Sequence, residues 1–486
     1  MRTISRIAAS AALLLGFAAA VNAAPQLDRM DPPFWYTGMK NTELQMMFYG
    51  PNISKADFTL EEYEGVRVKE ISKTSNPNYL FVYLDVTSQA KPGTMTFTFQ
   101  DPGTKKSKKT TLTKTFELKD RNQKVGALGF TPADVLYLIM PDRFSNGDPT
   151  NDNLDGFTVN RQNGGGRHGG DFRGIMNHLD YIDNLGVTAI WLNPVQYNRG
   201  NASHGYSITD YYMVDPRFGS NDEYCEFIDA SHQKGLKVVM DMIFNHCGSN
   251  HWWLSDVPDA DWFNQNWYAE QIMERNRAAA QARPGQGQPQ QNFGGQRGRG
   301  QARPDFEMPK TIAEFNALTE EQKAQVLRSS GAAPAAERQL TNTTHYKWTL
   351  LDPHAPKTEQ DILVDGWFTA GMPDLIQNCI WWIEFSRIDG IRMDTYPYAD
   401  YDFMVRWCNE VLAEYPDFNI VGETWYPVSP AFTAWWQKGS KLSPAYESNL
   451  KTVMDFNLMF ISQTAFDEVS KQDEQFSKGL FKIYES

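Results

Sequence analysis

From about residue 135 onward, short apolar runs alternate with segments of helical periodicity, and this rhythm restricts the possible folds more than any other feature of the 486-residue chain. The runs have the length of strands, and helical spacing fills several of the gaps between them. The candidate strands are Val135–Met140, Ala189–Asn193, Lys237–Met242, Gly390–Met393, Asn419–Gly422 and Thr452–Phe456. The candidate helices are 176–186, 221–235, 376–388 and 401–415. Repeated strand–helix units indicate a parallel sheet, and this series predicts an α/β fold of the (β/α)8 TIM-barrel type rather than an open sheet.

The chain before residue 126 has a different pattern. Apolar and polar residues alternate strictly in segments such as 79–84 and 94–99, and turn-forming residues separate the segments. This alternation predicts an immunoglobulin-like β-sandwich over residues 24–125. The barrel would then occupy residues 126–486.

The first 23 residues have the pattern of a secretory signal peptide. Arg2 and Arg6 precede an apolar run from Ile7 to Val21, and small residues follow at the predicted cleavage site before Ala24. A membrane anchor is the alternative, but the run is shorter than the roughly 20 residues that span a bilayer. We therefore expect a secreted protein with no membrane insertion.

The third and fourth candidate strands are about 150 residues apart, which is far more than a crossover helix needs. We therefore expect an inserted subdomain at 247–370, with a low-complexity, disordered loop at 277–304. The loop contains an RGG-like tract, but a net charge of -13 argues against nucleic acid or anionic membranes as partners. Neutral sugars remain compatible with this charge. Four cysteines without CxxC spacing are expected to be small buried residues rather than disulfides.

Three candidate strands end in an acidic residue: Asp241, Asp394 and Glu423. A single acid in this position is commonly a helix N-cap, but the carboxyl ends of barrel strands converge on one face, where catalytic groups gather. Arg392 lies two residues before Asp394 and therefore faces the same side of the strand, where it would favour the ionised carboxylate. Neighbouring strands lie about 4.8 Å apart, so acids at the ends of adjacent strands would lie close together.

A second polar cluster follows the first candidate strand. Hard oxygen ligands at close spacing suit Ca²⁺, while Asn, Asp and Gly also form ordinary polar turns, and the spacing alone leaves both readings open. The candidate calcium ligands are Asn146, Asp148, Asn151, Asp152, Gly169 and Asp171.

Several segments together resemble the signature regions of the α-amylase family. They are DMIFNH at 241–246, GIRMDTYPY at 390–398, IVGETWY at 420–426, HGYSITDYYMVDPRFGS at 204–220 and GMPDL at 371–375. The order and spacing are most similar to the cyclomaltodextrinase and neopullulanase branch, as found in Bacteroidetes-type periplasmic starch systems. The resemblance implies α-glucan oligosaccharides or cyclodextrins as substrates, a periplasmic location, and structural Ca²⁺ at the polar cluster.

The resemblance also implies a role for each residue that matches a motif. Asp394 would be the nucleophile, Glu423 the general acid/base, and Arg392 the group that orients and ionises Asp394. The substrate-binding region would contain His204, Tyr206, Asp241, Asn245 and His246, of which Tyr206 stacks on the attacked sugar while Asp241 and Asn245 support the site.

The sequence departs from the family pattern in two places. None of the eight histidines is followed by Asp, although relatives carry a His-Asp pair on the seventh strand, and no seventh or eighth strand is recognisable. A polar stretch expected between Leu375 and Ile376 is also missing. We therefore expect a barrel lacking its last two strands and a 486-residue chain with little activity. Three functions remain open: a glucan hydrolase, a transglycosylase using the same residues, and a non-catalytic glucan-binding protein.

Overall fold

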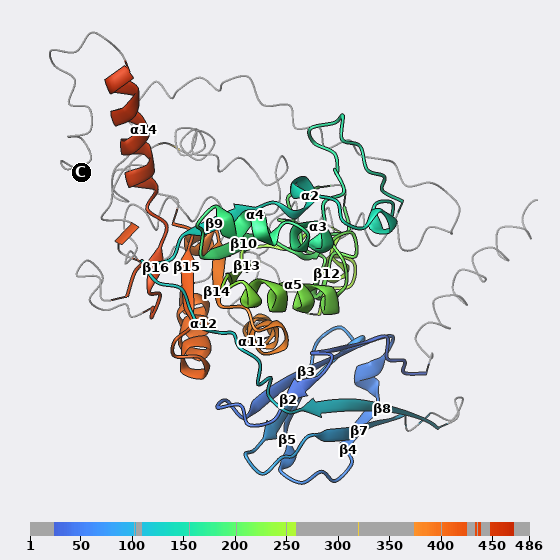
Figure 1. Ribbon diagram of the computed structural model, residues 1–486. Helices are drawn as coiled ribbons and strands as arrows, with labels where there is room; N and C mark the ends of the chain where they lie inside the picture. The colour runs from blue at the N-terminus through green and yellow to red at the C-terminus, as the bar shows by residue number, and fades with distance from the viewer. Residues whose placement is uncertain are drawn as a thin grey trace, which may run out of the picture. The chain divides into compact units, whose positions relative to one another are not determined.

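The computed structural model describes residues 24–258, 319, 374–424, 433–438 and 448–470, apart from positions 102, 104–108, 155, 201, 249, 400 and 435 (Figure 1). The predicted signal peptide at 1–23, the loop at 277–304 and nearly all of the predicted subdomain at 247–370 lie outside these residues. The chain divides into two compact units between Gln123 and Lys124, and Val257 and Pro258 belong with the first unit.

The first unit is a β-sandwich, as the alternating pattern predicts. One sheet has the strand order β1-β3-β6-β5 and the other β2-β8-β7-β4. Inward-facing aromatic side chains fill the space between the sheets, where Phe48 contacts the rings of Phe58, Phe97 and Phe99. The strands are β1 Arg29–Asp31, β2 Trp35–Tyr36, β3 Glu43–Tyr49, β4 Asp57–Leu60, β5 Val66–Lys73, β6 Tyr79–Val86, β7 Gly93–Asp101 and β8 Thr110–Lys119, and a short 3-10 helix, η1, covers Ile53–Lys55.

The second unit contains the predicted parallel sheet. Its six strands run in the order β16-β15-β14-β13-β10-β9, so neighbours in the sheet follow one another along the chain, as they do in a β/α barrel. All six predicted strands are present. They are β9 Leu136–Ile139, β10 Ala189–Leu192, β13 Lys237–Ile243, β14 Gly390–Asp394, β15 Asn419–Gly422 and β16 Thr452–Val453. β13 continues two residues beyond Asp241, so this acid lies within the strand rather than at its end.

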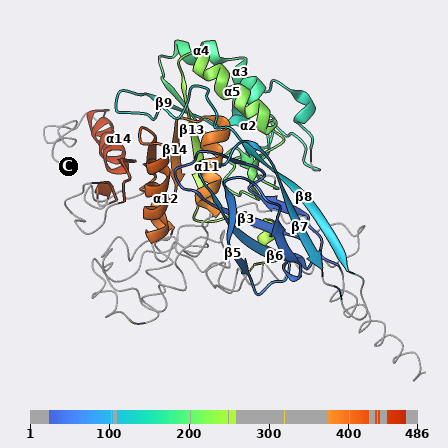
Figure 2. The ribbon, with the colours of Figure 1, turned by 90° about the horizontal axis from the view of Figure 1, so that it is seen from below.

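Helices pack along this sheet, and α11 contacts both α5 and α12 (Figures 1 and 2). α5 begins with a capping box, in which Ser220 and Glu223 satisfy each other's backbone N–H groups. The helices of this unit are α2 Pro141–Phe144, α3 Phe172–Met176, α4 Leu179–Asn184, α5 Asn221–Gln233, α11 Asp374–Ser386, α12 Tyr401–Glu414 and α14 Phe456–Ser470, with 3-10 helices η2 Pro149–Asn151, η3 Trp252–Leu254 and η5 Tyr396–Tyr398. None of the described helices is long and apolar enough to cross a membrane.

One face of the sheet is apolar at its amino-terminal end. Val239 and Val421 form a buried cluster there with Phe130, and Leu136, Trp191 and Met454 pack against it. A Cβ atom on Gly390 would lie 2.4 Å from the Phe130 ring, so only glycine fits at this point of β14. Because successive residues on a strand alternate between faces, the side chains two positions further along these strands lie on the same face.

The predicted burial of the cysteines is confirmed for Cys247, Cys379 and Cys408, and Cys225 is partly buried. All four thiols are free. Burial raises the pKa of Cys225 and Cys408 to about 12, so these thiols carry no reactive thiolate at neutral pH.

Candidate active site

Strand register places the charged residues of three neighbouring strands at two adjacent levels. Asp241 on β13 pairs in register with Arg392 on β14, and Ile243 pairs with Asp394. On the other side of β14, Met393 pairs with Gly422, and the Glu423 N–H donates to the Met393 carbonyl at 3.0 Å. The three acids predicted from the sequence therefore meet near the carboxyl ends of adjacent strands, with Asp241 two residues before the end of β13.

A single guanidinium joins the three carboxyl groups. Arg392 Nη1 contacts Asp241 Oδ1 at 3.0 Å and Asp394 Oδ1 at 2.8 Å, and Nη2 contacts Glu423 Oε1 at 2.7 Å. Arg392 is only 4% exposed and Asp241 only 1%, so these interactions lie away from bulk water. Water screens charges only weakly in such a buried site, so each charge strongly affects the ionisation of its neighbours.

The pKa values reflect this crowding of negative charge around one positive group. Burial raises the pKa of Asp241 to about 7, with Asp394 adding to the shift and Arg392 opposing it. Burial also raises the pKa of Glu423, and the neighbouring Asp394 adds to the effect through its charge and a hydrogen bond. Glu423 therefore retains its proton to a higher pH than an ordinary glutamate does.

Two residues not singled out in the sequence help to build this centre. The indole Nε1–H of Trp191 donates to Asp241 Oδ2 at 3.0 Å, and the Trp191 ring lies 5.2 Å from the Arg392 guanidinium. Thr395 has a positive φ of 46°, which is uncommon for a residue with a side chain, and its N–H donates to Glu423 Oε2 at 2.9 Å. The Thr395 hydroxyl also donates to Asp394 Oδ2 at 3.1 Å.

The predicted sugar-binding residues gather beside the acids. The Tyr206 hydroxyl donates to Asp241 Oδ2 at 3.0 Å, and the Tyr206 ring stacks against His204 with the ring centres 5.7 Å apart. The imidazole of His246 lies 3.2 Å from the Tyr206 carbonyl through Nε2 and 3.3 Å from Asn245 Nδ2 through Nδ1. Burial lowers the pKa of both histidines, which favours neutral imidazoles.

The six candidate calcium ligands lie together in the loops after β9. Asn146 Nδ2 donates to Asp152 Oδ1 at 2.7 Å, and Gly169 approaches the same oxygen so closely that a Cβ atom there would be 2.3 Å from it. Asp148 caps η2, and Asp171 caps α3 while also accepting the Asp148 N–H at 2.8 Å. The sequence alone did not reveal these two capping roles.

Both amide oxygens of this cluster lack a hydrogen-bond donor. Asn146 Oδ1 and Asn151 Oδ1 are buried and have no partner among the described residues. No group of three or more Asp, Glu, His or Cys side chains suited to a metal occurs in the described part of the chain, so a cation here would depend on amide and carbonyl oxygens as well. Unpartnered oxygen atoms beside carboxylates fit the ligand preference of Ca²⁺.

A parallel β/α unit with a guanidinium-bridged group of acids at the carboxyl ends of its strands has the architecture of a barrel enzyme. Sequence comparison finds two domain models that match parts of the chain. Residues 138–318 match the model of the α-amylase catalytic domain, and residues 29–122 match the cyclomaltodextrinase N-terminal domain. Residues 138–318 therefore belong to an α-amylase-type catalytic domain, whose family has the TIM-barrel fold, and the β-sandwich before them is of the cyclomaltodextrinase N-terminal type.

Curated relatives match the chain over about a quarter of its length. The chain is 44% identical to a β/α-amylase of Paenibacillus polymyxa over 27% of its own length and 11% of that protein. It is 37% identical to a cyclomaltodextrinase of Thermoanaerobacter pseudethanolicus over 27% of the chain and 24% of the relative. It is 36% identical to neopullulanase 2 of Thermoactinomyces vulgaris over 25% of the chain and 21% of the relative. The matched region thus spans less than a quarter of each of these proteins.

Proposed function

We propose that this protein is a glycoside hydrolase that cleaves α-1,4-glucosidic bonds of starch-derived oligosaccharides, cyclodextrins or pullulan with retention of anomeric configuration. The observation that carries the proposal is the contact of one guanidinium, that of Arg392, with both Asp394 and Glu423. The Arg392 guanidinium holds these two carboxyl groups together at the ends of adjacent strands, and a double-displacement mechanism needs two such groups close together. The names of the relatives support the choice of substrate.

In the first step, an Asp394 carboxylate oxygen attacks the anomeric carbon while Glu423 gives its proton to the departing glycosidic oxygen. Arg392 Nη1 donates to Asp394 Oδ1 at 2.8 Å and so orients the attacking carboxylate group. Because its pKa is raised, the Glu423 carboxyl group keeps a proton that it can give to the leaving oxygen. In the second step, Glu423 takes a proton from water, and the resulting hydroxide releases the sugar from Asp394 with a second inversion.

The residues beside the acids bind the attacked sugar. His204 Nδ1 accepts the Tyr206 N–H at 3.0 Å, so the neutral imidazole carries its proton on Nε2 and can donate it to a sugar hydroxyl. The Tyr206 ring offers a flat face for stacking on the sugar. Asp241 and Asn245 would support the site: Asp241 accepts hydrogen bonds from Tyr206 and Trp191, and Asn245 Nδ2 lies 3.3 Å from His246 Nδ1.

Proton NMR of the first product tests the mechanism. Maltoheptaose or β-cyclodextrin should release an α-anomer first, and a β-anomer would refute retention. Asp394→Asn should abolish turnover, whereas Asp417→Asn, which changes an exposed aspartate after α12, should leave it unchanged. Equal activity in both variants would exclude Asp394 as the nucleophile.

The same residues also serve transglycosylation, in which a sugar hydroxyl replaces water in the second step. Chain lengthening of maltotriose would show transfer, and glucose or maltose release would show hydrolysis. Tight maltoheptaose binding with no product of either kind would instead show a glucan-binding protein.

We further propose that Ca²⁺ binds the loops after β9 and has a structural role. Asn146, Asp148, Asn151 and Asp152 would provide side-chain oxygens, and Gly169 a carbonyl oxygen. Asp171 would organise the loop through the backbone N–H groups that it accepts. The unpartnered amide oxygens support this assignment, since a buried acceptor without a donor is unfavourable unless a ligand fills the gap.

Chelation tests the calcium site. A cation that binds only the folded state stabilises it, so EDTA followed by desalting should lower the melting temperature, and added Ca²⁺ should restore it. An unchanged melting curve together with no calcium by elemental analysis would reject the site.

The predicted export to the periplasm is tested separately, by N-terminal sequencing of the periplasmic protein, which should begin near Ala24.

A further inference from the structure

The loop that carries His204 and Tyr206 contains no helix or strand of its own among its described residues. It leaves β11 (Gln196–Tyr197) and returns at β12 (Asp210–Val214), and these two short strands pair at its base. The Thr209 N–H donates to the Tyr197 carbonyl at 2.7 Å and closes the loop. Something else must therefore fix the conformation of its middle.

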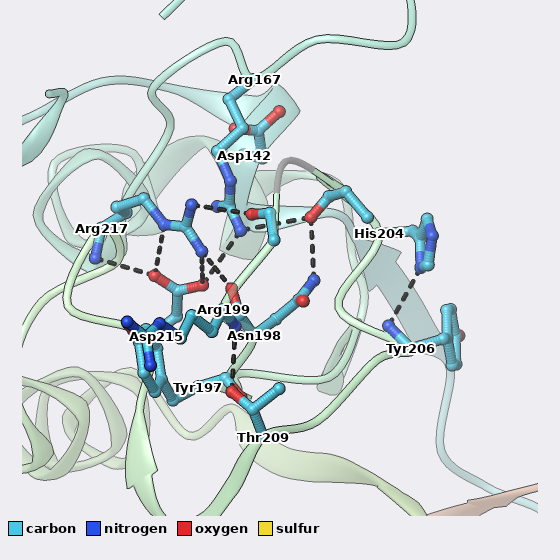
Figure 3. Close-up of polar contacts among 12 residues, drawn as sticks. Asp142, Arg167, Tyr197, Asn198, Arg199, His204, Tyr206, Thr209, Asp215 and Arg217 are labelled. Atoms are coloured by element: carbon cyan, nitrogen blue, oxygen red, sulfur yellow. Dashed lines mark hydrogen bonds and ion pairs between the residues drawn. The ribbon is translucent and has the colours of Figure 1, made fainter. Parts of the chain in front are cut away.

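Asp215, directly after β12, is the centre of a buried ionic cluster that contacts this loop (Figure 3). Its Oδ1 accepts from Arg217 Nε at 2.7 Å, and its Oδ2 accepts from Arg217 Nη2 at 2.7 Å and from Arg167 Nη2 at 3.0 Å. Asp215 is 1% exposed and both arginines are 3% exposed. One carboxylate thus holds two guanidinium groups away from solvent.

The two arginines use further N–H groups to hold alternate carbonyl groups of the loop. Arg217 Nη1 donates to the Gly200 carbonyl at 2.9 Å, and Nη2 donates to the Asn198 carbonyl. Arg167 Nη2 donates to the Ala202 carbonyl at 3.2 Å. Figure 3 shows these contacts leading along the loop to His204, two residues beyond the last carbonyl held.

A cluster of this kind is a poor way to gain stability alone. Burying charges is costly, and well-packed apolar residues often stabilise a core as well as a buried ion pair does. The planar fork of arginine does something that apolar residues cannot, because it fixes acceptors at defined positions. The acceptors here are backbone carbonyls of the loop that carries two sugar-binding residues.

We propose that Asp215, Arg217 and Arg167 form a clamp that positions His204 and Tyr206 against the reacting centre. The three clamp residues do not touch the substrate. They act by fixing the loop. The loop in turn connects to the charged centre, because the Tyr206 hydroxyl donates to Asp241 Oδ2 at 3.0 Å. The proposal rests on the glycosidase function above, because it assigns the clamp a role in that reaction.

The clamp also affects the electrostatics of the loop. The buried charge of Arg167 adds to burial and to the nearby His246 in lowering the pKa of His204, whereas Asp394 raises it. The neutral imidazole is the form whose Nδ1 accepts the Tyr206 N–H. The clamp therefore supports the hydrogen bond that joins the two sugar-binding side chains.

Arg217→Lys tests the clamp while keeping a positive charge beside Asp215. A lysine ammonium cannot reproduce the fork, so the contacts to the Asn198 and Gly200 carbonyls should be lost. The matched control is Arg406→Lys on α12, where a half-exposed arginine pairs with Glu410. Hydrogen–deuterium exchange should rise in the peptide 198–209 for Arg217→Lys and stay unchanged for the control. Unchanged exchange in both variants would overturn the clamp whatever the activity.

Kinetics with a double-mutant cycle tests whether the clamp acts through Tyr206. With an aryl maltoside as substrate, Arg217→Lys should lower kcat/KM about tenfold or more, since small displacements of positioning groups are costly. In a Tyr206→Ala background the same substitution should cost much less, because residues that act as one unit are non-additive. Equal losses in both backgrounds would show a purely structural cluster and overturn the proposal. Wild-type protein without turnover, but with the exchange effect present, would instead refute the glycosidase function and with it the clamp's role in catalysis.

Discussion

Replacement of Trp191 by Phe isolates one hydrogen bond to the charged centre. The substitution keeps an aromatic ring beside Arg392 and removes the indole N–H that donates to Asp241 Oδ2 at 3.0 Å. A hydrogen bond to a charged group contributes about 1.5–3 kcal/mol, and each pKa unit corresponds to about 1.4 kcal/mol. The pKa of Asp241, about 7 in the wild-type protein, should therefore rise by roughly one to two units.

The sign of the stability change follows from the protonation state of Asp241, because the Trp191 hydrogen bond stabilises its ionised form. The folded-state pKa of Asp241 lies above its ordinary value of 3.8, so the free energy of unfolding falls as the pH rises between these two values. In Trp191→Phe the fall should continue to higher pH, because the lost bond stabilised only the ionised carboxylate. The variant should thus lose about 1.5–3 kcal/mol more at pH 9 than at pH 5.

Guanidinium unfolding followed by tryptophan fluorescence measures this difference. Trp35 is the only tryptophan before residue 124, so the signal reports mainly on the second unit. Trp382→Phe is the matched control, since the Trp382 indole donates to the neutral carbonyl of Tyr211 at 2.8 Å and its loss should be independent of pH. If the pH 9 to pH 5 difference for Trp191→Phe does not exceed that of Trp382→Phe, the indole does not stabilise ionised Asp241.

Three further changes probe the charged centre and the calcium loop. Glu423→Gln should block turnover of substrates with poor leaving groups, while an aryl glycoside still forms the covalent intermediate, which mass spectrometry of the intact protein detects. Arg392→Met should destabilise the protein by about 3–5 kcal/mol at pH 8 and by less at pH 5, where fewer of the surrounding carboxyl groups are ionised; denaturant unfolding at the two pH values measures this. Asn151→Ala should remove the response of the melting temperature to EDTA, and a response as large as in the wild-type protein would exclude Asn151 as a ligand.

The parts of the site that sequence analysis predicted are those that depend on local pattern. The apolar runs determine where strands form, and an acid at the end of a run in a parallel sheet must lie at one edge. Asp394 and Glu423 were placed correctly for this reason, and Arg392 followed from the two-residue period of a strand.

The parts that were missed depend on contacts between distant segments. Trp191 reaches Asp241 from a strand about 50 residues earlier, and Asp215 meets Arg167 across 48 residues. No spacing rule connects such residues, because their proximity follows from sheet register and loop conformation. Thr395 was missed for another reason: its left-handed backbone, which directs its N–H at Glu423, is unusual for threonine.

The register between β13, β14 and β15 brings the charged residues of the candidate active site together. On the inner face, Val239 precedes Asp241 by two residues, Gly390 precedes Arg392, and Val421 precedes Glu423. Because Val421 pairs in register with Arg392, the face changes from apolar to charged one step later on β15 than on β13 and β14, above the buried cluster around Phe130. A slip of one residue in β14 would move Arg392 and Asp394 to the opposite face and separate them from Asp241 and Glu423.

The contact between Phe130 and Gly390 opposes such a slip. The Phe130 ring occupies the space that a side chain at position 390 would need, so a slip that brought a neighbouring residue of β14 to this point would force the ring out of the cluster. Gly390→Ala would test this link between packing and charge. A Cβ atom 2.4 Å from the ring must displace it, and the displacement should disturb Arg392 two residues away. We expect a lower melting temperature and, in parallel, a lower kcat, whereas lower stability with full activity at low temperature would show that Gly390 matters for packing alone.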